Sequence, residues 1–476
     1  MTTLENVDVL QANIIAAGTN KKAKRIVNSF GTLMGSREYN EEQDEDSAGV
    51  QEILAKDKAE KAKWANKKHI SEQPWTLQNW HQHINWLNVV LVMVIPAIGL
   101  YMTRSTPLKW QTAATAIIQY VFSGISITAG YHRLWAHKAY NARLPLRLFF
   151  ALFGAASVEG SIKWWGHSHR IHHRYTDTPR DPYDARQGFW YSHMGWMLVQ
   201  PNPKHKARAD ISDLIDDWVV RVQHKHYMLI MALVGFVLPT LFCGYFFNDY
   251  KGGFVYAGIC RVFFIQQATF CVNSLAHWIG VQPFDDRRTP RDHWITALVT
   301  FGEGYHNFHH EFPSDYRNAI KWYQYDPTKV LIWASSKVGL AYNLKTFSQN
   351  AIEQGLVQQQ QKKIDKMRRN LNWGTPLSQL PVWDKEEFVE KCKGDNAKGL
   401  VIINGIVHDV SGYISEHPGG EPLLMASIGK DASKAFNGGV YLHSNAAHNL
   451  LATMRVAVIR DSFAARRQEN ELKKEQ

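Results

Sequence analysis

A chain of 476 residues with 45% hydrophobic side chains is long enough for two or three domains, which excludes a mini-protein or a fibre. Its formal net charge of +11 indicates anionic partners such as phosphates, nucleic acid or a membrane surface, without choosing among them. Four cysteines without a C-x-x-C pair argue against a disulfide framework or a zinc ribbon and favour a reducing compartment.

The first 75 residues are polar and rich in charge. An acidic stretch at 41–46 precedes a basic stretch at 56–68, and no apolar core of the signal-peptide type is present. We expect this segment to be largely disordered and cytosolic.

Four apolar runs follow, at 87–103, 110–129, 227–247 and 254–272. At about 1.5 Å per residue, each can cross or nearly cross a hydrocarbon core of about 30 Å. The runs form two pairs with short turns, so we expect two membrane hairpins whose turns face the lumen and whose long basic loops and both termini are cytosolic. The alternative is a soluble helical protein with buried core helices. Arg261, Gln266 and Gln267 in the fourth run should face protein or a polar cavity.

Nine of the 22 histidines fall into a pattern near the ends of these runs. In a helix, positions i, i+3 and i+4 share one face, so each H-x-x-H-H triplet projects three imidazoles into one place. By the expected topology, all nine lie on the cytosolic side. Isolated histidines such as His193, His205, His224 and His293 are more often ordinary core or surface residues. The nine are His132 and His137; His169, His172 and His173; His277, with Asn273 one helical turn before it; and His306, His309 and His310.

Nine neutral ligands are enough for two metal ions. Imidazole suits zinc, copper, iron and nickel, whereas a structural zinc site closes with four ligands and a catalytic one uses about three. Imidazole-rich coordination at membrane level favours iron and oxygen chemistry, although the spacing alone still allows zinc.

The histidines form three boxes, H-x-x-x-x-H at His132, H-x-x-H-H at His169 and H-x-x-H-H at His306. These boxes resemble those of the membrane fatty acyl desaturases, in particular the acyl-CoA delta-9 (stearoyl-CoA) desaturases. The sequences in and around them that carry the resemblance are "TAGYHRLWAHKAY", "ARLPLR", "RDPYDARQGFWYSHMGW" and "GEGYHNFHHEFPSDYR". The resemblance covers about residues 75–343, within a desaturase domain expected at 76–345. It implies an α-helical integral membrane protein with a di-iron centre in a cytosolic helical cap above four transmembrane helices. Carried over by position, it implies one iron bound by His132, His169, His306 and His309, with Asn273 holding a water, and a second bound by His137, His172, His173, His277 and His310.

Substrate contacts are expected at both ends of an acyl tunnel. Gly124 and Tyr120 lie two and three turns before His132, about 12 and 18 Å deeper in the membrane, where their size would limit chain length. Ordinary packing within the membrane is the alternative. Lys204, Lys206 and Arg208 are candidate phosphate partners for the CoA head group, or plain solvated cations.

The carboxyl-terminal part changes in composition. Residues 346–378 resemble a linker, 379–462 a small separate domain, and 463–476 a charged tail. His417 begins an H-P-G-G turn that can present an imidazole to a flat cofactor, and His443 can supply the opposite ligand, with His448 as a competitor. This stretch resembles the α+β domain of cytochrome b5, which implies haem b and favours His443. A carboxyl-terminal position is typical of fungal delta-9 desaturases.

The resemblance implies an enzyme that uses O2 to place a cis double bond between carbons 9 and 10 of palmitoyl- or stearoyl-CoA. Electrons would come from NADH through a separate cytochrome b5 reductase, because no G-x-G-x-x-G fingerprint is visible. It also implies residence in the endoplasmic reticulum membrane among its lipids, and no nucleic-acid partner is expected. A membrane fatty acyl hydroxylase, another lipid desaturase and a haem-bearing carrier remain alternatives.

Overall fold

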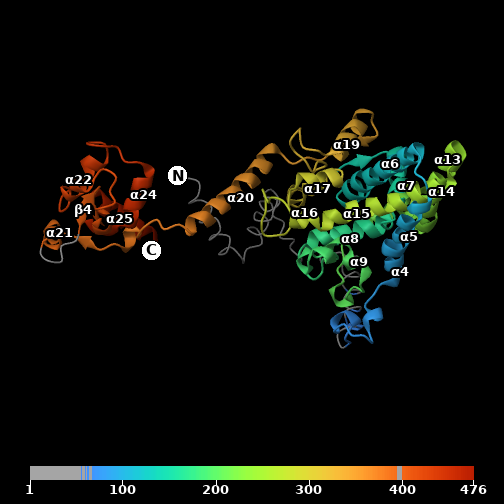
Figure 1. Cartoon of the computed structure of the whole chain (residues 1–476), viewed down its shortest axis with the longest axis horizontal. Helices are drawn as coiled ribbons and strands as arrows, with labels where there is room; N and C mark the ends of the chain where they lie inside the picture. The colour runs from blue at the N-terminus through green and yellow to red at the C-terminus, as the bar shows by residue number, and fades with distance from the viewer. Residues whose placement is uncertain (1–54, 56–58, 60–61, 64–66, 394–398, 476) are drawn as a thin grey trace, which may run out of the picture. The chain divides into compact units, whose positions relative to one another are not determined.

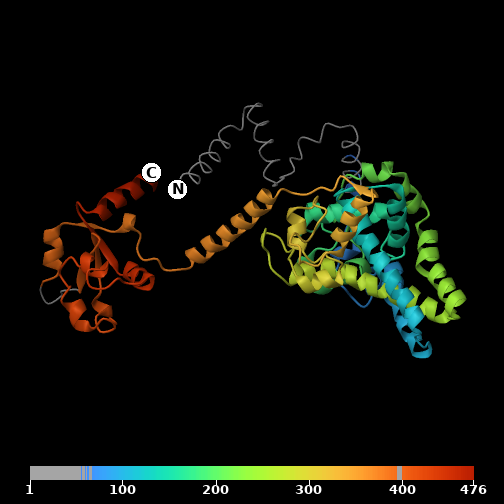
Figure 2. The same ribbon diagram turned by 90° about the horizontal axis from the view of Figure 1, so that it is seen from above.

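The computed structural model describes residues 55, 59, 62, 63, 67–393 and 399–475 (Figure 1). Most of the predicted polar amino-terminal segment therefore lies outside the described residues. Contacts divide the chain into two units, one up to Gln360 and the other from Gln361. The division falls inside helix α20 (Gln349–Arg369), so the segment predicted as a linker is largely one continuous helix (Figure 2).

Among the described residues, four helices are long and apolar enough to cross a membrane: Trp86–Ser105, Trp110–Ala136, Tyr227–Phe247 and Tyr250–Trp278. Three of them extend beyond the predicted runs, and the longer extensions of the second and fourth helices carry His132 and His277. Each helix mixes α-helical with wider π-helical or tighter 3-10 turns. In chain order they comprise α4 (Trp86–Val89), η3 (Val90–Val94), α5 (Ile95–Met102) and η4 (Thr103–Ser105); α6 (Trp110–Ile125) and η5 (Ser126–Ala136); α12 (Tyr227–Ala232), η9 (Leu233–Val237) and α13 (Leu238–Phe247); α14 (Tyr250–Gly252), η10 (Gly253–Cys260), α15 (Arg261–Asn273) and α16 (Leu275–Trp278).

The fourth of these helices buries its polar residues against protein, as expected. Arg261 is 2% exposed and donates hydrogen bonds to the carbonyls of Ala156 (2.6 Å) and Gly235 (2.9 Å). Gln266 is buried as well. A buried guanidinium needs such partners, so Arg261 ties three separate segments together.

Shorter helices and a two-stranded sheet complete this unit. Strand β1 (Asn141–Ala142) pairs antiparallel with β2 (Ala341–Tyr342). The helices are α7 (Leu144–Ala155), α8 (Ile162–Tyr175), α9 (Trp196–Leu198), α10 (Ser212–Asp216), α11 (Trp218–Lys225), α17 (Trp294–Val299), α18 (His306–Glu311) and α19 (Pro327–Lys337).

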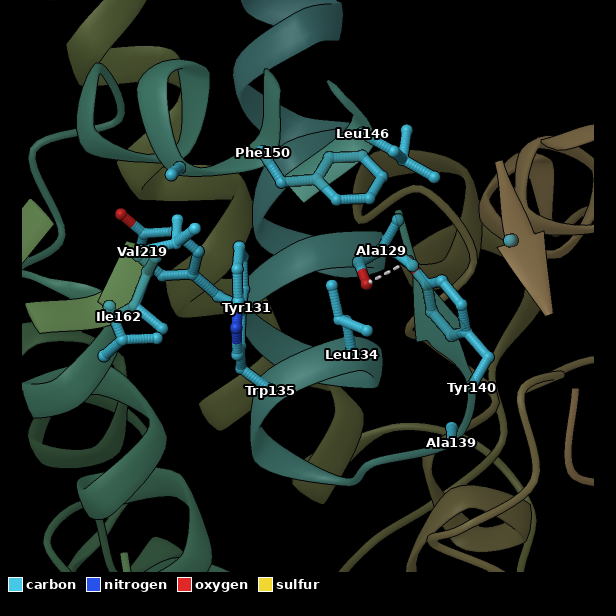
Figure 3. Close-up of a cluster of buried hydrophobic side chains, with 14 of the residues drawn as sticks. Ala129, Tyr131, Leu134, Trp135, Ala139, Tyr140, Leu146, Phe150, Ile162 and Val219 are labelled. Carbon is cyan, nitrogen blue, oxygen red and sulfur yellow. Dashed lines mark hydrogen bonds between the residues drawn. The ribbon is translucent and has the colours of Figure 1, made fainter. Parts of the chain in front are cut away.

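A hydrophobic core holds η5 against α7 and α8 (Figure 3). Tyr131 of η5 packs so closely on α7 that a Cβ at Gly154 would lie 2.4 Å from its ring. Tyr140 donates a hydrogen bond of 2.8 Å to the carbonyl of Ala129, which fixes the chain where it leaves η5. Close packing of this kind leaves η5, which carries His132 and ends just before His137, little freedom to shift.

The second unit is a small α+β domain built on a four-stranded sheet in the order β3-β6-β5-β4. Strand β3 (Val382–Trp383) runs parallel to β6 (Arg455–Ile459), whereas β5 (Ile406–Asp409) is antiparallel to β6 and to β4 (Leu400–Ile403). The helices are α21 (Lys385–Lys391), α22 (Glu421–Met425), α23 (Ser433–Phe436), α24 (Asn445–Thr453) and α25 (Phe463–Glu475). The part of the chain that the structure describes is mostly helical, with four candidate membrane helices and a small α+β domain, which confirms the predicted fold class.

Candidate metal centre, cavity and haem site

The first histidine box lies on a π-helical turn. The amide of His137 donates to the carbonyl of His132 at 3.0 Å, an i→i+5 bond. An α-helix with 3.6 residues per turn would place positions five apart on different faces, whereas a π-turn returns them to the same side. The two imidazole centroids are 4.7 Å apart. The local widening of η5 is therefore what makes the H-x-x-x-x-H spacing usable by one site.

All nine predicted histidines meet, in two groups whose potential ligand atoms lie within 4.8 Å of one another. The second and third boxes come from α8 and α18, and His277 comes from α16. We call the first set the five-histidine group and the second the four-histidine group. The five-histidine group is His132, His137, His169, His173 and His309; the four-histidine group is His172, His277, His306 and His310.

Three histidines group differently in the structure from the division expected from the resemblance. The π-turn brings Nε2 of His137 to 2.8 Å from Nε2 of His169, so His137 joins the five-histidine group. His173 also belongs to that group, since its Nε2 lies 3.0 Å from that of His309. His306 belongs instead to the four-histidine group, where its Nε2 lies 3.0 Å from Nε2 of His310.

The spacing of these nitrogens suits a shared metal ion. Nε2 of His309 lies 3.0 Å from Nε2 of both His132 and His173. A neutral imidazole carries one N–H, so these close approaches of nitrogen to nitrogen cannot all be well-satisfied hydrogen bonds. Two nitrogens bound to one metal at about 2.1 Å and at right angles lie about 3 Å apart. Metal coordination therefore accounts for the geometry, and the residues present fit a metal ion in each group.

The protonation state of the histidines also suits metal binding. Burial, reinforced by the neighbouring imidazoles, lowers the pKa well below the usual value for His169, His306 and His309, and likewise for His137, His173 and His310. These imidazoles are neutral near pH 7, which leaves a lone pair available to a metal ion.

Acidic residues contact the Nδ1 atoms of two of these histidines, and the sequence did not single those acidic residues out. Oε2 of Glu303 lies 2.9 Å from Nδ1 of His132, and both oxygens of Asp181 lie 3.0 Å from Nδ1 of His172. Burial would raise the pKa of Glu303, but the charge of Arg133 outweighs it and lowers the pKa to about 2. Carboxylates of this kind fix the ring orientation and tautomer of a histidine ligand.

A cavity of about 1340 Å³ opens beside the histidines, and His132, His169 and Asn273 lie on its wall. Gly124 also lines it, and a Cβ there would lie 2.4 Å from the ring of Phe301, another lining residue. Tyr120 packs on the same ring, with centroids 5.5 Å apart, and is not among the described residues that line the cavity.

Glu159 is a second residue of this wall that the sequence reasoning missed. Its carboxyl accepts a hydrogen bond of 2.8 Å from the hydroxyl of Thr269, which also lines the cavity. Burial raises the pKa of Glu159 to about 8. The group is therefore mostly neutral near pH 7, which suits a wall in contact with an uncharged, apolar ligand.

The three predicted phosphate partners have different positions. Lys206 and the neighbouring His167 line the cavity. Burial and the charges of Arg208 and Lys206 lower the pKa of His167, so these cations lie near one another. Lys204 forms an ion pair of 2.9 Å with Glu72. The polar end of the cavity is thus rich in positive charge.

In the second unit, the structure brings His417 and His443 together, with ring centroids 6.4 Å apart. Nδ1 of His417 donates to the carbonyl of Gly420 (3.1 Å), and Nδ1 of His443 to that of Phe436 (2.9 Å). Both Nε2 atoms then keep their lone pairs, so His417 and His443 could each bind the iron of a haem. His448 instead packs edge-on against Phe436. Large apolar side chains that are exposed in this unit, and that a flat cofactor could cover, are Leu423, Met425, Val440, Tyr441 and Leu442.

Comparison with known proteins agrees with both sites. Residues 108–345 match the model of the family "Fatty acid desaturase", and residues 384–460 match "Cytochrome b5-like Heme/Steroid binding domain". The chain is 66% identical to "Acyl-CoA desaturase 1" of Saccharomyces cerevisiae, over 96% of this chain and 91% of that one. The chain belongs to the fatty acid desaturase family.

Two further relatives of this desaturase point the same way. It is 56% identical to "Probable acyl-CoA desaturase" of Schizosaccharomyces pombe, over 84% of this chain and 82% of that one. It is 41% identical to "Delta(9)-fatty-acid desaturase fat-6" of Caenorhabditis elegans, over 56% of this chain and 80% of that one. Family membership makes the protein an oxidoreductase of fatty acyl chains, and the two matched domains imply a metal centre and a haem.

Proposed function

We propose that this desaturase inserts a cis double bond between carbons 9 and 10 of palmitoyl- or stearoyl-CoA, with O2 and with electrons delivered through its own haem domain. The observation that carries the proposal is that the two histidine groups adjoin each other, with the ring centroids of His173 and His310 4.1 Å apart, and that His132 and His169 of the five-histidine group lie on the wall of one cavity. The names of the relatives support an acyl-CoA substrate, and that of the nematode relative supports position 9.

Two iron ions are the proposed metals. Each histidine group would hold one ion. Asn273 lies on the cavity wall, one turn before His277, and would hold a water near one of the two ions. Neutral nitrogen ligands without thiolate suit iron that reacts with oxygen. The iron pair would supply the activation of O2 and the removal of two hydrogens from the chain.

The protein itself positions the substrate and excludes water. Trp165 stacks on His169, with centroids 4.9 Å apart, and lines the cavity where the reacting carbons would lie. At the far end, Gly124 and Tyr120, with Phe301 between them, would limit the length of the acyl chain. Because the acyl chain is held in one position along the cavity, the same two carbons always lie beside the metal ions, and the oxidation is specific for that position.

The polar end would bind the CoA head group. Lys206 and His167 line it, and Arg208 is close to His167. Lys204 would contribute after exchanging its ion pair with Glu72 for a phosphate. Phosphates bind such cationic sites more strongly than a single carboxylate does, because they offer more charge and more acceptor oxygens.

The electron balance calls for an outside donor. Reduction of O2 to two waters takes four electrons, of which the saturated chain supplies two. A haem with two histidine ligands, His417 and His443, carries one electron at a time and must be reduced twice for each double bond. NADH-cytochrome b5 reductase is the proposed source, and the endoplasmic reticulum membrane, with both termini cytosolic, is the proposed location.

The test is mass spectrometry of total fatty acids, with double-bond positions mapped, from desaturase-null cells that express the wild type, His309→Ala or His226→Ala. His309 belongs to the five-histidine group, whereas His226 is exposed and lies outside both groups, so it is the matched control. New 9-unsaturated 16- and 18-carbon acids are expected with the wild type and His226→Ala and not with His309→Ala.

Other products would contradict the proposal. Hydroxylated acids would indicate a fatty acyl hydroxylase, and double bonds elsewhere would indicate another lipid desaturase. If His309→Ala made as much product as the wild type, the five-histidine group would not be catalytic, and the absence of any new product despite good expression of the wild type would indicate a haem-bearing carrier.

A further inference from the structure

A turn after helix α8 reaches two ligands of the four-histidine group at once. This turn, residues 177–181, begins and ends with an aspartate, and we call it the aspartate turn. Asp177 and Asp181 are each 3% exposed. The amide of Asp177 donates to Oδ2 of Asp181 at 3.2 Å, which joins the two carboxylates in one small unit. Buried carboxylates are kept where they are hydrogen-bonded or close to a positive charge.

One end of the turn acts directly on a ligand. Both oxygens of Asp181 lie 3.0 Å from Nδ1 of His172, and both side chains are almost fully buried. The carboxylate accepts the proton on Nδ1, so the lone pair of His172 resides on Nε2. That nitrogen lies within the four-histidine group, 3.2 Å from Nε2 of His310.

The other end acts through a hydroxyl. Oδ1 of Asp177 lies 2.5 Å from the hydroxyl of Thr289, and Oδ2 accepts the amide of Thr289 at 2.7 Å. The same hydroxyl lies 2.7 Å from Nδ1 of His277. A hydroxyl has one proton, and the carboxylate takes it, so Thr289 must accept from Nδ1–H of His277. Nε2 of His277 therefore keeps its lone pair, and this buried atom has no hydrogen-bond partner among the described residues.

The backbone of Asp177 is held in an unusual conformation for this contact. Its φ is +62°, in the left-handed region that aspartate and asparagine enter more readily than most residues. Strained backbone of this kind persists where the surrounding contacts fix it. Here those contacts run to Thr289, which lies 112 positions along the chain.

The two groups differ in this support. In the five-histidine group, Glu303 contacts His132 and also accepts hydrogen bonds from the guanidinium of Arg133. In the four-histidine group, the carboxylate of Asp177 accepts from the hydroxyl and the amide of Thr289, and neither of these contacts is with a guanidinium. The four-histidine group thus has two aspartates in contact with its histidines or their hydroxyl partner, whereas the carboxylate beside His132 is shared with Arg133.

We propose that the aspartate turn is a positioning element that selectively holds the metal ion of the four-histidine group, with Asp177 acting on His277 through the hydroxyl of Thr289. The inference rests on the proposed metal pair. Loss of such a supporting contact typically lowers metal affinity by about 10- to 100-fold. Only one of the two ions should be affected.

The experiment measures iron per chain in the purified full-length protein after dialysis against a ferrous chelator, with Mössbauer spectra to tell the two positions apart. Thr289→Val removes the hydroxyl at nearly constant size, and Thr289→Ser restores it. Thr178→Val is the control, because this threonine of the same turn donates its hydroxyl to the carbonyl of Tyr175 rather than to a ligand partner. Asp177→Asn, which tolerates the left-handed backbone, is a second test that does not depend on Thr289.

Two irons are expected in the wild type, Thr289→Ser and Thr178→Val. One iron is expected in Thr289→Val and in Asp177→Asn, with affinity for the second lowered about 10- to 100-fold. Retention of both ions in these two variants, or loss of both ions together, would overturn the role of the aspartate turn. The wild-type iron content separately tests the proposed function, and a wild type without iron would overturn both proposals.

Discussion

The length of the acyl chain should be limited where Gly124 contacts Phe301 in the wall of the cavity. Gly124 lies on α6 about 12 Å before His132, by the rise of about 1.5 Å per residue along a helix. A Cβ at this position would lie 2.4 Å from the ring of Phe301, about 1 Å closer than carbon atoms normally approach. Gly124→Ala must therefore displace the ring of Phe301, and Gly124→Phe must fill part of the cavity itself.

The magnitude follows from the methylenes that no longer fit. Each buried CH2 contributes about 0.8 kcal/mol, so excluding the two carbons that distinguish 18- from 16-carbon chains costs about 1.6 kcal/mol. At about 1.36 kcal/mol for each factor of ten, the ratio of 18- to 16-carbon products should fall about 15-fold in Gly124→Phe. Phe301→Gly should shift the ratio the other way, because it removes the ring and relieves a positive φ of 54°.

The assay is the ratio of unsaturated 18- to 16-carbon acids made by desaturase-null cells, measured by gas chromatography with mass spectrometry. Ile117→Phe is the matched control, since it adds the same side chain to the same helix at a position that is 63% exposed. An unchanged product ratio in Gly124→Phe, or an equal shift in Ile117→Phe, would refute the reasoning.

Three further predictions concern the metal, the cavity wall and the haem. Glu303→Gln should weaken metal binding at the five-histidine group by tenfold or more, because it removes the carboxylate beside His132; unchanged metal affinity in a chelator competition would contradict this. Because burial raises the pKa of Glu159 from 4.5 to about 8, the folded state binds the proton more tightly, and the free energy of unfolding should decrease as pH rises from about 4.5 to 8. That slope should be smaller in Glu159→Gln, as measured by thermal unfolding across this range. His443→Ala should abolish the Soret absorbance, whereas His448→Ala should retain it; the reverse result would exchange their roles.

The sequence alone was enough to predict the features that depend on neighbouring positions along the chain. The length of an apolar run predicts a membrane helix, and the i, i+3, i+4 spacing places the imidazoles of an H-x-x-H-H box on one helical face. The H-P-G-G turn at His417 is equally local. For these reasons the four helices and the nine histidines could be named in advance, and the structure brings those histidines together.

Only the tertiary structure decided how the nine histidines divide between two groups. His137 joins the five-histidine group because η5 widens into a π-turn, and helical spacing read from the sequence does not reveal that turn. Thr289 and Asp177 meet across 112 positions, and Phe301 faces Gly124 across 177. Such contacts arise from the packing of separate helices and loops rather than from local periodicity. The candidate histidine ligands could therefore be predicted from the sequence, whereas their grouping, the carboxylates that contact them and the wall of the cavity required the folded chain.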